Sequence, residues 1–128
     1  MTKRDSVLGA AGLGQVALQV SDIDRAEGFY RDVLGLRPLY RFGELAFFDL
    51  AGPRLMLEGG HEVHGPSDSL CLYFSVSELE SVVGRLVARG VYFERPPQLV
   101  ARMPDHELWM AFFRDPDGHL FGLMEERR

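Results

Sequence analysis

Cysteine is nearly absent from this chain of 128 residues, in which Cys71 is the single one. One cysteine cannot form an internal disulfide, so we expect a protein of a reducing compartment, the cytoplasm. The sequence also lacks any run approaching the roughly 20 apolar residues that a membrane-spanning helix needs. Its opening, MTKRDSVLGAAGLG, has a short apolar run broken by glycines, which is unlike a secretory signal peptide.

Basic residues are also in short supply, with 14 Lys and Arg against 19 Asp and Glu and a formal net charge of -5. This balance repels phosphate backbones and anionic membranes, so we expect neither nucleic acid nor a membrane as partner. An acidic protein suits a cationic ligand better. The length leaves no room for a second domain, and the 46% hydrophobic content is enough for one core, so residues 1–128 are predicted to form a single domain.

An internal repeat organises the chain. QVALQVSDIDRAEGFYRDVLGL (15–36) and CLYFSVSELESVVGRLVARGV (71–91) share an apolar strand, a Val-Ser-acid step and an amphipathic segment that ends at glycine. FFDLAGPRLMLE (47–58) likewise resembles FFRDPDGHLFGLME (112–125). Each half is therefore predicted to be one βαβββ module, at about 13–60 and about 69–126, joined by a glycine-rich linker at 58–68.

Apolar spacing and capping residues predict one helix in each half. The first should begin at Ser21 or Asp22 and end at Gly35; the second should begin at a capping box and end at Gly90. That capping box is formed by Ser77 and Glu80. Three strands should follow each helix, at about 37–43, 44–50 and 53–58 and at about 97–103, 107–114 and 119–125.

Alternation along the strands assigns their side chains to two faces. In both first strands the apolar residues should pack on the helix, which turns the intervening residues toward a cleft. By the repeat, alternate residues of the last strands should face the same cleft. The residues predicted to face it are Gln15, Gln19, Met56, Glu58, Cys71, Tyr73, Ser75, Gly122 and Met124. For the strand at 107–114, alternation puts Trp109 and Phe112 on opposite faces without saying which faces inward.

The segments VALQVSDIDRAEGFYRDVLGL, RLMLE and FFRDPDGHLFGLME resemble the vicinal oxygen chelate superfamily, which includes glyoxalase I, bleomycin-resistance proteins, fosfomycin-resistance enzymes and extradiol dioxygenases. The resemblance extends over about residues 13–125. It implies an α+β fold in which two tandem βαβββ modules form curved mixed sheets around a U-shaped cleft. It also implies a homodimer, which agrees with the limited surface that two halves of about 60 residues can bury alone.

The resemblance further implies four metal-ligand positions, which fall on Gln15, Met56, Cys71 and Gly122. One amide, a thioether, a thiol and no side chain at all make a poor donor set for a hard or borderline divalent ion. We therefore expect no metal ligands and no cofactor. Gly122 is interpreted as a vacated ligand position, which leaves space for a bound molecule or for a neighbouring side chain.

The function predicted from these residues is metal-independent binding of a small, partly apolar molecule by the nine cleft residues, in the manner of bleomycin-resistance proteins. The alternative is an enzyme, a glyoxalase-like lyase or isomerase or a dioxygenase, with a metal held by Gln15, Glu58 and His106. The sequence leaves open whether any reaction is catalysed and which ligand binds.

Several side chains have a structural interpretation beside the functional one. Glu58 is either a base or a solvated strand end, and Cys71 is either a nucleophile or an inert packed thiol. Tyr73 either orients a ligand or packs in the core. His61 and His64, in the sequence HEVH, are expected to be solvated loop histidines, and His119 is assigned no role.

Overall fold

The computed structural model describes residues 7–63 and 65–128, so that His64 lies outside the described residues. The chain forms two four-stranded sheets. Sheet A has the order β1-β4-β3-β2 and is built from β1 (Gln15–Gln19), β2 (Pro38–Phe42), β3 (Leu45–Asp49) and β4 (Arg54–Glu58). Sheet B has the order β5-β8-β7-β6 and is built from β5 (Ser67–Ser75), β6 (Phe93–Arg102), β7 (Glu107–Arg114) and β8 (His119–Arg127).

Both sheets are mixed in the same way. The first strand of each module runs parallel to the last, β1 to β4 and β5 to β8, and the remaining pairs are antiparallel. Between the first and second strands lie α1 (Ile23–Gly28) with the π-helical turn η2 (Phe29–Val33), and α2 (Leu79–Ala88). The α+β class and the two tandem βαβββ modules are confirmed.

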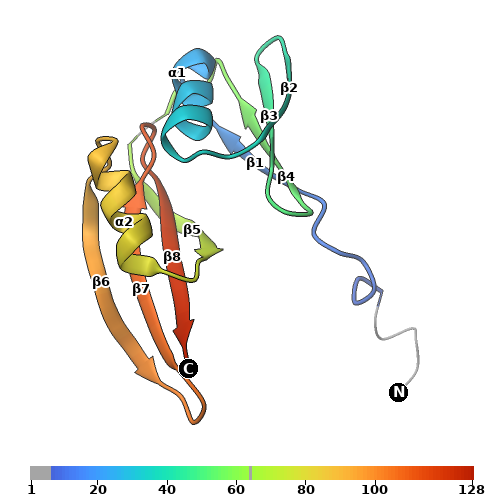
Figure 1. Cartoon of the computed structure of the whole chain (residues 1–128). Coiled ribbons are helices and arrows are strands. Elements are labelled where there is room, and N and C mark those ends of the chain that lie inside the picture. The colour runs from blue at the N-terminus through green and yellow to red at the C-terminus, as the bar shows by residue number, and fades with distance from the viewer. Residues whose placement is uncertain (1–6, 64) are drawn as a thin grey trace.

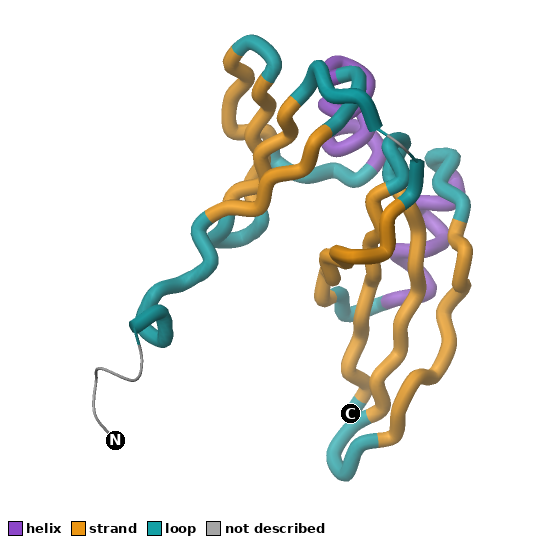
Figure 2. Tube along the Cα trace, turned by 180° about the vertical axis from the view of Figure 1, so that it is seen from behind, coloured by secondary structure: helices purple, strands orange, loops and turns teal. Residues whose placement is uncertain are grey.

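The modules meet at α1 and at the turn between β7 and β8, and the two sheets extend from there as separate arms (Figure 1). Seen from behind, both helices lie on the far side of the sheets (Figure 2). One hydrophobic core joins the modules on this helical side, and it includes Tyr30 and Phe48 from the first and Phe113 and Phe121 from the second. Because the core is shared, each module is stabilised by the other.

The first helix begins and ends at residues that the sequence predicted. Asp22 is its N-cap and accepts a hydrogen bond from Arg25 N–H at 3.1 Å. Ser21, the other predicted cap, instead binds the second module. Gly35 has φ +75°, a left-handed value that suits glycine after a helix. The π-helical turn at Phe29–Val33 was not visible in the apolar spacing.

The predicted capping box of the second helix is wrong. Glu78 is the N-cap and its side chain makes no capping bond. The N–H of Leu79 donates to Glu125 of β8 at 3.3 Å, and Glu80 pairs with Arg127 of the same strand. One carboxylate and one arginine from β8 thus replace the local box, tertiary contacts that the helix sequence alone cannot reveal. Gly90 follows the helix with φ +95°, as predicted.

Strand β6 begins at Phe93, four residues before the predicted start at 97. The strand therefore includes Pro96 and Pro97, which have no N–H to donate to a ladder. β6 is an edge strand, and its register shifts between Arg95 and Gln98, so these prolines leave no ladder bond unmade. Among the described residues no helix is long and apolar enough to cross a membrane.

Candidate functional site: the open faces of the two sheets

We term the helix-free face of each sheet its open face. On β1 the side chains of Val16 and Leu18 turn toward the core, and Gln15, Ala17 and Gln19 are exposed on the open face. The register pairs Ala17 with Met56 and Gln19 with Glu58. In sheet B the register pairs Tyr73 with Gly122 and Ser75 with Met124. The structure thus places the nine predicted residues on the two open faces.

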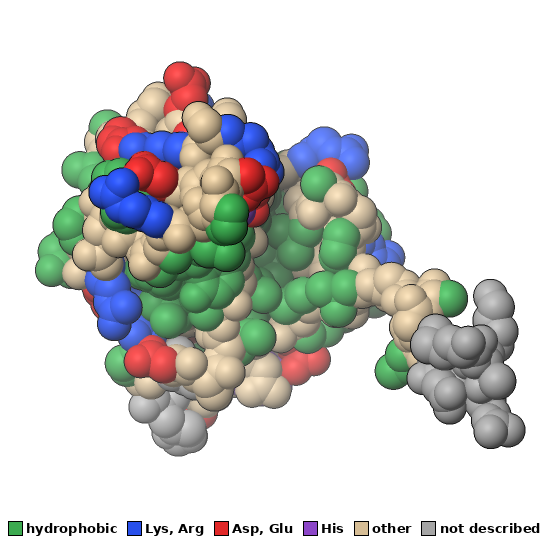
Figure 3. Space-filling model, turned by 90° about the horizontal axis from the view of Figure 1, so that it is seen from below, with side chains coloured by type: hydrophobic (Ala, Val, Ile, Leu, Met, Phe, Trp, Pro, Cys, Tyr) green, Lys and Arg blue, Asp and Glu red, His purple; other side chains and the backbone are tan. Residues whose placement is uncertain are grey.

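The open question about β7 is answered by burial and register. Ala111 and Phe113 are completely buried on the helical side, and Trp109 packs against the same core. Phe112 pairs with Gly122 and therefore lies on the open face. Seen from below, hydrophobic side chains gather in the hollow between the two modules (Figure 3).

On sheet A, Phe47 of β3 forms the base of a small aromatic group. Tyr40 stacks on Phe47 with ring centroids 4.4 Å apart, and the guanidinium carbon of Arg54 lies 5.7 Å from the Phe47 centroid. Arg54 Nη1 also donates to the Tyr40 hydroxyl at 3.2 Å. We term these three residues platform A. Tyr40 is 50% exposed, so the outer surface of the platform is available to a ligand.

Sheet B carries a matching group around Phe112. Tyr73 meets Phe112 edge to face with centroids 5.8 Å apart, and the guanidinium carbon of Arg95 lies 5.5 Å from the Phe112 centroid. Tyr73 is 48% exposed. We term Tyr73, Phe112 and Arg95 platform B. Each open face therefore presents one half-exposed tyrosine, one phenylalanine beside it and one arginine.

Gly122 makes room for platform B. A Cβ at this position would lie 2.6 Å from Cδ2 of Tyr73 and 3.1 Å from Cε1 of Phe112. The first distance is shorter than real Cβ contacts and the second is tight, so the tyrosine ring lies where a side chain of residue 122 would be. Of the two uses proposed for the vacated position, the neighbouring side chain is the one observed.

We expect Gly122→Ala to displace the Tyr73 ring from its position over β8. The clash should reduce the free energy of unfolding by about 1 kcal/mol, because overpacking outweighs the gain in strand propensity. In a Tyr73→Ala background the same substitution should be neutral or stabilising. Urea denaturation of the four proteins measures this cycle, and an equal loss in both backgrounds would show that Tyr73 is not what requires the glycine.

Cys71 is a half-buried free cysteine whose surroundings favour the thiol over the thiolate. Burial raises the pKa of its thiol, and the opposing effects of the Tyr73 hydroxyl and Arg114 offset this rise only in part. The pKa of Tyr73 is raised as well, first by desolvation and then by the nearby Cys71. A raised thiol pKa means less thiolate at neutral pH, and thiolate is the reactive form.

The four family positions form two pairs on different sheets. Gln15 donates its amide N–H to the Met56 sulfur at 3.7 Å on sheet A, and Cys71 and Gly122 lie on the neighbouring strands β5 and β8 of sheet B. Among residues 7–63 and 65–128 no group of three or more His, Cys, Asp or Glu side chains could hold a metal ion. This donor set does not fit a divalent metal.

The alternative donors have other partners. Gln15 binds Met56, whereas the Glu58 carboxylate lies 2.5 Å from the His61 ring, so Glu58 is not simply solvated. The β1–β4 register separates Gln15 from the Glu58 end by four residues, about 13 Å at a rise of about 3.3 Å per residue. His106 lies at the β6–β7 hairpin of the other sheet and binds Asp105 at 2.7 Å.

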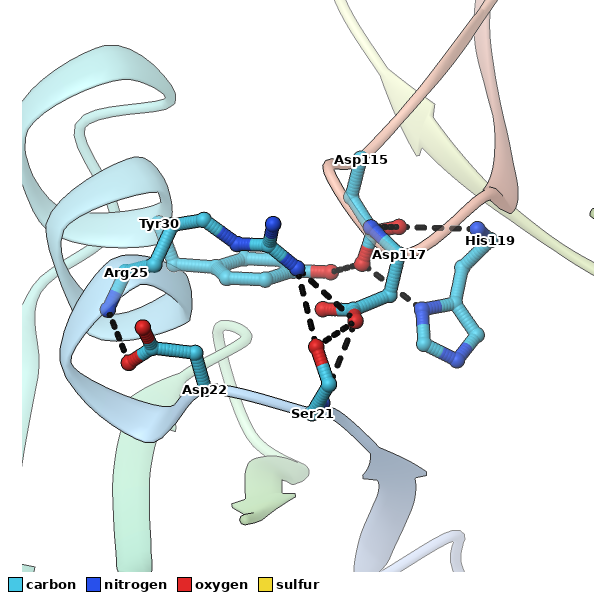
Figure 4. A network of polar contacts seen from close by, with 7 residues as sticks. All are labelled: Ser21, Asp22, Arg25, Tyr30, Asp115, Asp117 and His119. Atoms are coloured by element: carbon cyan, nitrogen blue, oxygen red, sulfur yellow. Dashed lines mark hydrogen bonds and ion pairs between the residues drawn. The ribbon is translucent and has the colours of Figure 1, made fainter. Parts of the chain in front are cut away.

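A buried polar network joins the modules beside the open faces (Figure 4). Asp115 and Asp117, in the turn before β8, are 5% and 7% exposed. Asp115 accepts hydrogen bonds from the Tyr30 hydroxyl at 2.6 Å and from the backbone N–H groups of Asp117 and His119. The His119 ring lies 2.7 Å from the same carboxylate. The DPDG sequence signalled a turn, but its carboxylates also hold α1 in place.

The second carboxylate of this network binds the start of the first helix. Asp117 accepts from Ser21 N–H, from the Ser21 hydroxyl and from Arg25, at 3.1, 2.9 and 3.0 Å. Ser21 therefore serves the contact between modules rather than capping its own helix. Next to the network, a pocket of about 260 Å³ is lined by residues of β1, β5 and β8, among them Gln19, Leu70 and Leu120. Gln19 thus lies where the two sheets meet.

His119 should make stability depend on pH. The hydrogen bond that the His119 ring donates to Asp115 is the main reason that the pKa of His119 is raised above its ordinary value of 6.5. A raised folded-state pKa contributes stability below about pH 6.5, and this stability is lost as pH rises through the folded-state pKa. The destabilisation caused by His119→Gln should therefore be larger at pH 6 than at pH 9. Chemical denaturation at both pH values tests this, with His106→Gln as the control.

The residues of the two platforms other than Tyr73 were missed as site residues. The repeat contained a signal for the two phenylalanines, because Ala46-Phe47-Phe48 and Ala111-Phe112-Phe113 occupy equivalent strands. Tyr40, Arg54 and Arg95 have no such signal, because the two tyrosines lie on β2 and β5 and the two arginines on β4 and β6, which are not equivalent strands of the repeat.

The profile of the Glyoxalase/Bleomycin resistance protein/Dioxygenase superfamily matches residues 12–123, and the chain belongs to this superfamily. It is 27% identical over 125 residues to the metallothiol transferase FosB of Shouchella clausii (strain KSM-K16), a match that covers 91% of this chain and 84% of that protein.

Two solved structures show the same fold. TioX from Micromonospora sp. ML1 is 25% identical with a TM-score of 0.72, and the match covers 90% of this chain and 98% of TioX. A lactoylglutathione lyase from Agrobacterium tumefaciens is 24% identical with a TM-score of 0.69, covering 90% and 94%. The sequence resemblance to the superfamily is thus confirmed.

Proposed function

We propose that this protein binds a small, flat, partly apolar molecule on the open faces of its sheets without using a metal ion. The observation that carries the proposal is the pair of platforms. Each provides an exposed tyrosine ring against which a planar molecule can stack, with polar groups beside it. Gln15, Gln19, Glu58 and Ser75 supply hydrogen-bonding groups on the same faces, and Met56, Cys71 and Met124 supply apolar contacts.

The occupation of the family metal positions supports binding without a metal. Met56 and Gln15 contact each other, and Tyr73 covers Gly122. We expect protein purified without a chelating tag to contain far less than one divalent ion per chain, and we expect Gln15→Ala to leave that content unchanged. Elemental analysis after dialysis measures this. One zinc, nickel, iron or manganese ion per chain would overturn the proposal.

A second candidate is a metal-dependent transferase, which the similarity to a metallothiol transferase favours. It requires metal donors that the chain supplies at neither the family positions nor the set Gln15, Glu58 and His106. The elemental analysis therefore distinguishes the two functions directly. A lyase, isomerase or dioxygenase with the same nonstandard donors would give the same positive result.

We further propose that the protein is a cytoplasmic homodimer and that a second copy covers part of the open faces. Phe42, which is 74% exposed at the end of β2 and belongs to neither platform, provides apolar surface for such a contact. Light scattering should give twice the mass of one chain at micromolar concentration. A monomer at that concentration would contradict the dimer, and it would leave the platforms of one chain as the proposed site.

A further inference from the structure

The arginines of the two platforms differ from most arginines of this protein. Most of those elsewhere in the described part of the chain are paired with carboxylates, for example Arg25 with Asp117, Arg41 with Glu27 and Arg114 with Glu94, whereas Arg85 and Arg89, on and after α2, are not. Among the described residues, Arg54 and Arg95 lie within ion-pair distance of no carboxylate, and both are exposed. In an acidic chain with many available partners, two unpaired guanidinium groups on the candidate binding faces require an explanation.

The surroundings of Arg54 show that its charge is not neutralised nearby. Its cross-strand neighbour is Asp49, whose carboxylate lies 3.5 Å from Arg37 and also accepts the N–H of Ala51. Arg54 instead directs Nη1 to the Tyr40 hydroxyl and lies over the Phe47 ring. Its remaining N–H groups can donate to a ligand.

Arg95 is held in the same manner on the other sheet. Its guanidinium lies over Phe112, and the carboxylate of the adjacent Glu94 is bound to Arg114 at 2.5 Å. The positive charge of Arg95 is near enough to Tyr73 to oppose the rise in the pKa of that phenol. On both faces, therefore, a guanidinium lies beside an exposed tyrosine and has no acidic partner.

We infer that the ligand is a planar aromatic molecule with an anionic group, a carboxylate or a phosphate ester. Its ring stacks on Tyr40 or Tyr73, and its anion accepts hydrogen bonds from Arg54 or Arg95. The guanidinium matches such an anion in two parallel bonds, and the phenylalanine beneath keeps it in place. This inference rests on the proposed function and replaces the cationic ligand expected from net charge, because the local charge of the platforms has the opposite sign.

Three compounds of one shape test the sign of the ligand charge: naphthalene-2-carboxylate, neutral 2-naphthamide and the cationic 2-naphthylmethylammonium. By isothermal titration with EDTA present, the carboxylate should bind at least about tenfold more tightly than the amide, as expected for charge-assisted hydrogen bonds. The cation should bind more weakly than the amide. Raising the salt concentration should reduce the preference for the carboxylate.

The variants Arg54→Met and Arg95→Met keep an apolar contact with the phenylalanine and remove the charge. At least one should abolish the preference for the carboxylate and leave amide binding within about twofold of the parent. Arg85→Met is the matched control, because Arg85 is exposed on α2 with no ion pair to a described residue and lies away from the open faces. It should leave the preference unchanged.

Three outcomes overturn the inference, and they differ in whether they also contradict the binding function. Equal or tighter binding of the amide or the cation contradicts the anionic ligand and leaves the binding function standing. Failure of all three compounds to bind at millimolar concentration contradicts both. Retention of the full carboxylate preference in the double variant Arg54→Met/Arg95→Met would assign the anion to another group and also overturn the inference.

Discussion

Replacing Asp115 by alanine should reduce the free energy of unfolding by about 4 kcal/mol, because the substitution leaves several buried donors without acceptors. The Tyr30 hydroxyl and the N–H groups of Asp117 and His119 all donate to this carboxylate. Tyr30 is completely buried, so water cannot take over the bond to its hydroxyl. Urea denaturation followed by circular dichroism measures the loss.

The control is Asp105→Ala. Asp105 also binds a histidine, His106, and an arginine, Arg128, but it lies on the surface at the β6–β7 hairpin, where such pairs contribute little. Its substitution should leave the denaturation midpoint nearly unchanged. Tyr30→Phe should be destabilising in the parent and nearly neutral in the Asp115→Ala background. Equal effects in both backgrounds would mean that this hydrogen bond does not join the modules.

Phe121→Ala should be destabilising by about 4 kcal/mol, the range found for buried aromatic residues. Phe121 is completely buried and stacks on Phe74 and Phe113 at centroid distances of 5.9 and 5.5 Å. It also meets the ring of Tyr30 from the first module at 5.9 Å. A cavity at this position therefore removes contacts within sheet B and between the modules. Tyr92→Ala, at a 78% exposed site between α2 and β6, should have little effect on stability.

The shared core predicts that both modules respond to the Phe121 cavity. Amide exchange should show reduced protection in β3 and β4 of sheet A as well as in β7 and β8 of sheet B. If sheet A kept its full protection while sheet B lost it, the modules would be independent folding units, and the account of one core across the modules would be wrong.

The sequence predicted the fold because the relevant patterns are local and occur twice. Alternation on β1 and β5 placed Gln15 and Tyr73 on the open faces, and the apolar stripes located both helices. The predicted start of the second helix was wrong because Glu125, which is distant in the chain, accepts the hydrogen bond from Leu79 N–H that a local cap would have accepted.

The platforms could be predicted only in part, because their members come from strands that no pattern brings together. The repeat contained the phenylalanines, but the position of Arg95 over Phe112 depends on register shifts in β6 around two prolines. The unpaired state of Arg54 and Arg95 depends on which carboxylates the other arginines take. The role of His119 was missed because the DPDG turn gave no indication that Asp115 would be buried.

Amide chemical-shift mapping with 2-naphthamide in the presence of EDTA tests the central claim most directly, because this probe is neutral and independent of the ligand charge. The largest shifts should fall on the open faces, at Gln15, Met56, Tyr73, Phe112 and Gly122. Shifts confined to residues outside the open faces, for example on the helical side, would contradict binding on these faces. Binding that appears only after a divalent ion is added would contradict its independence of metal.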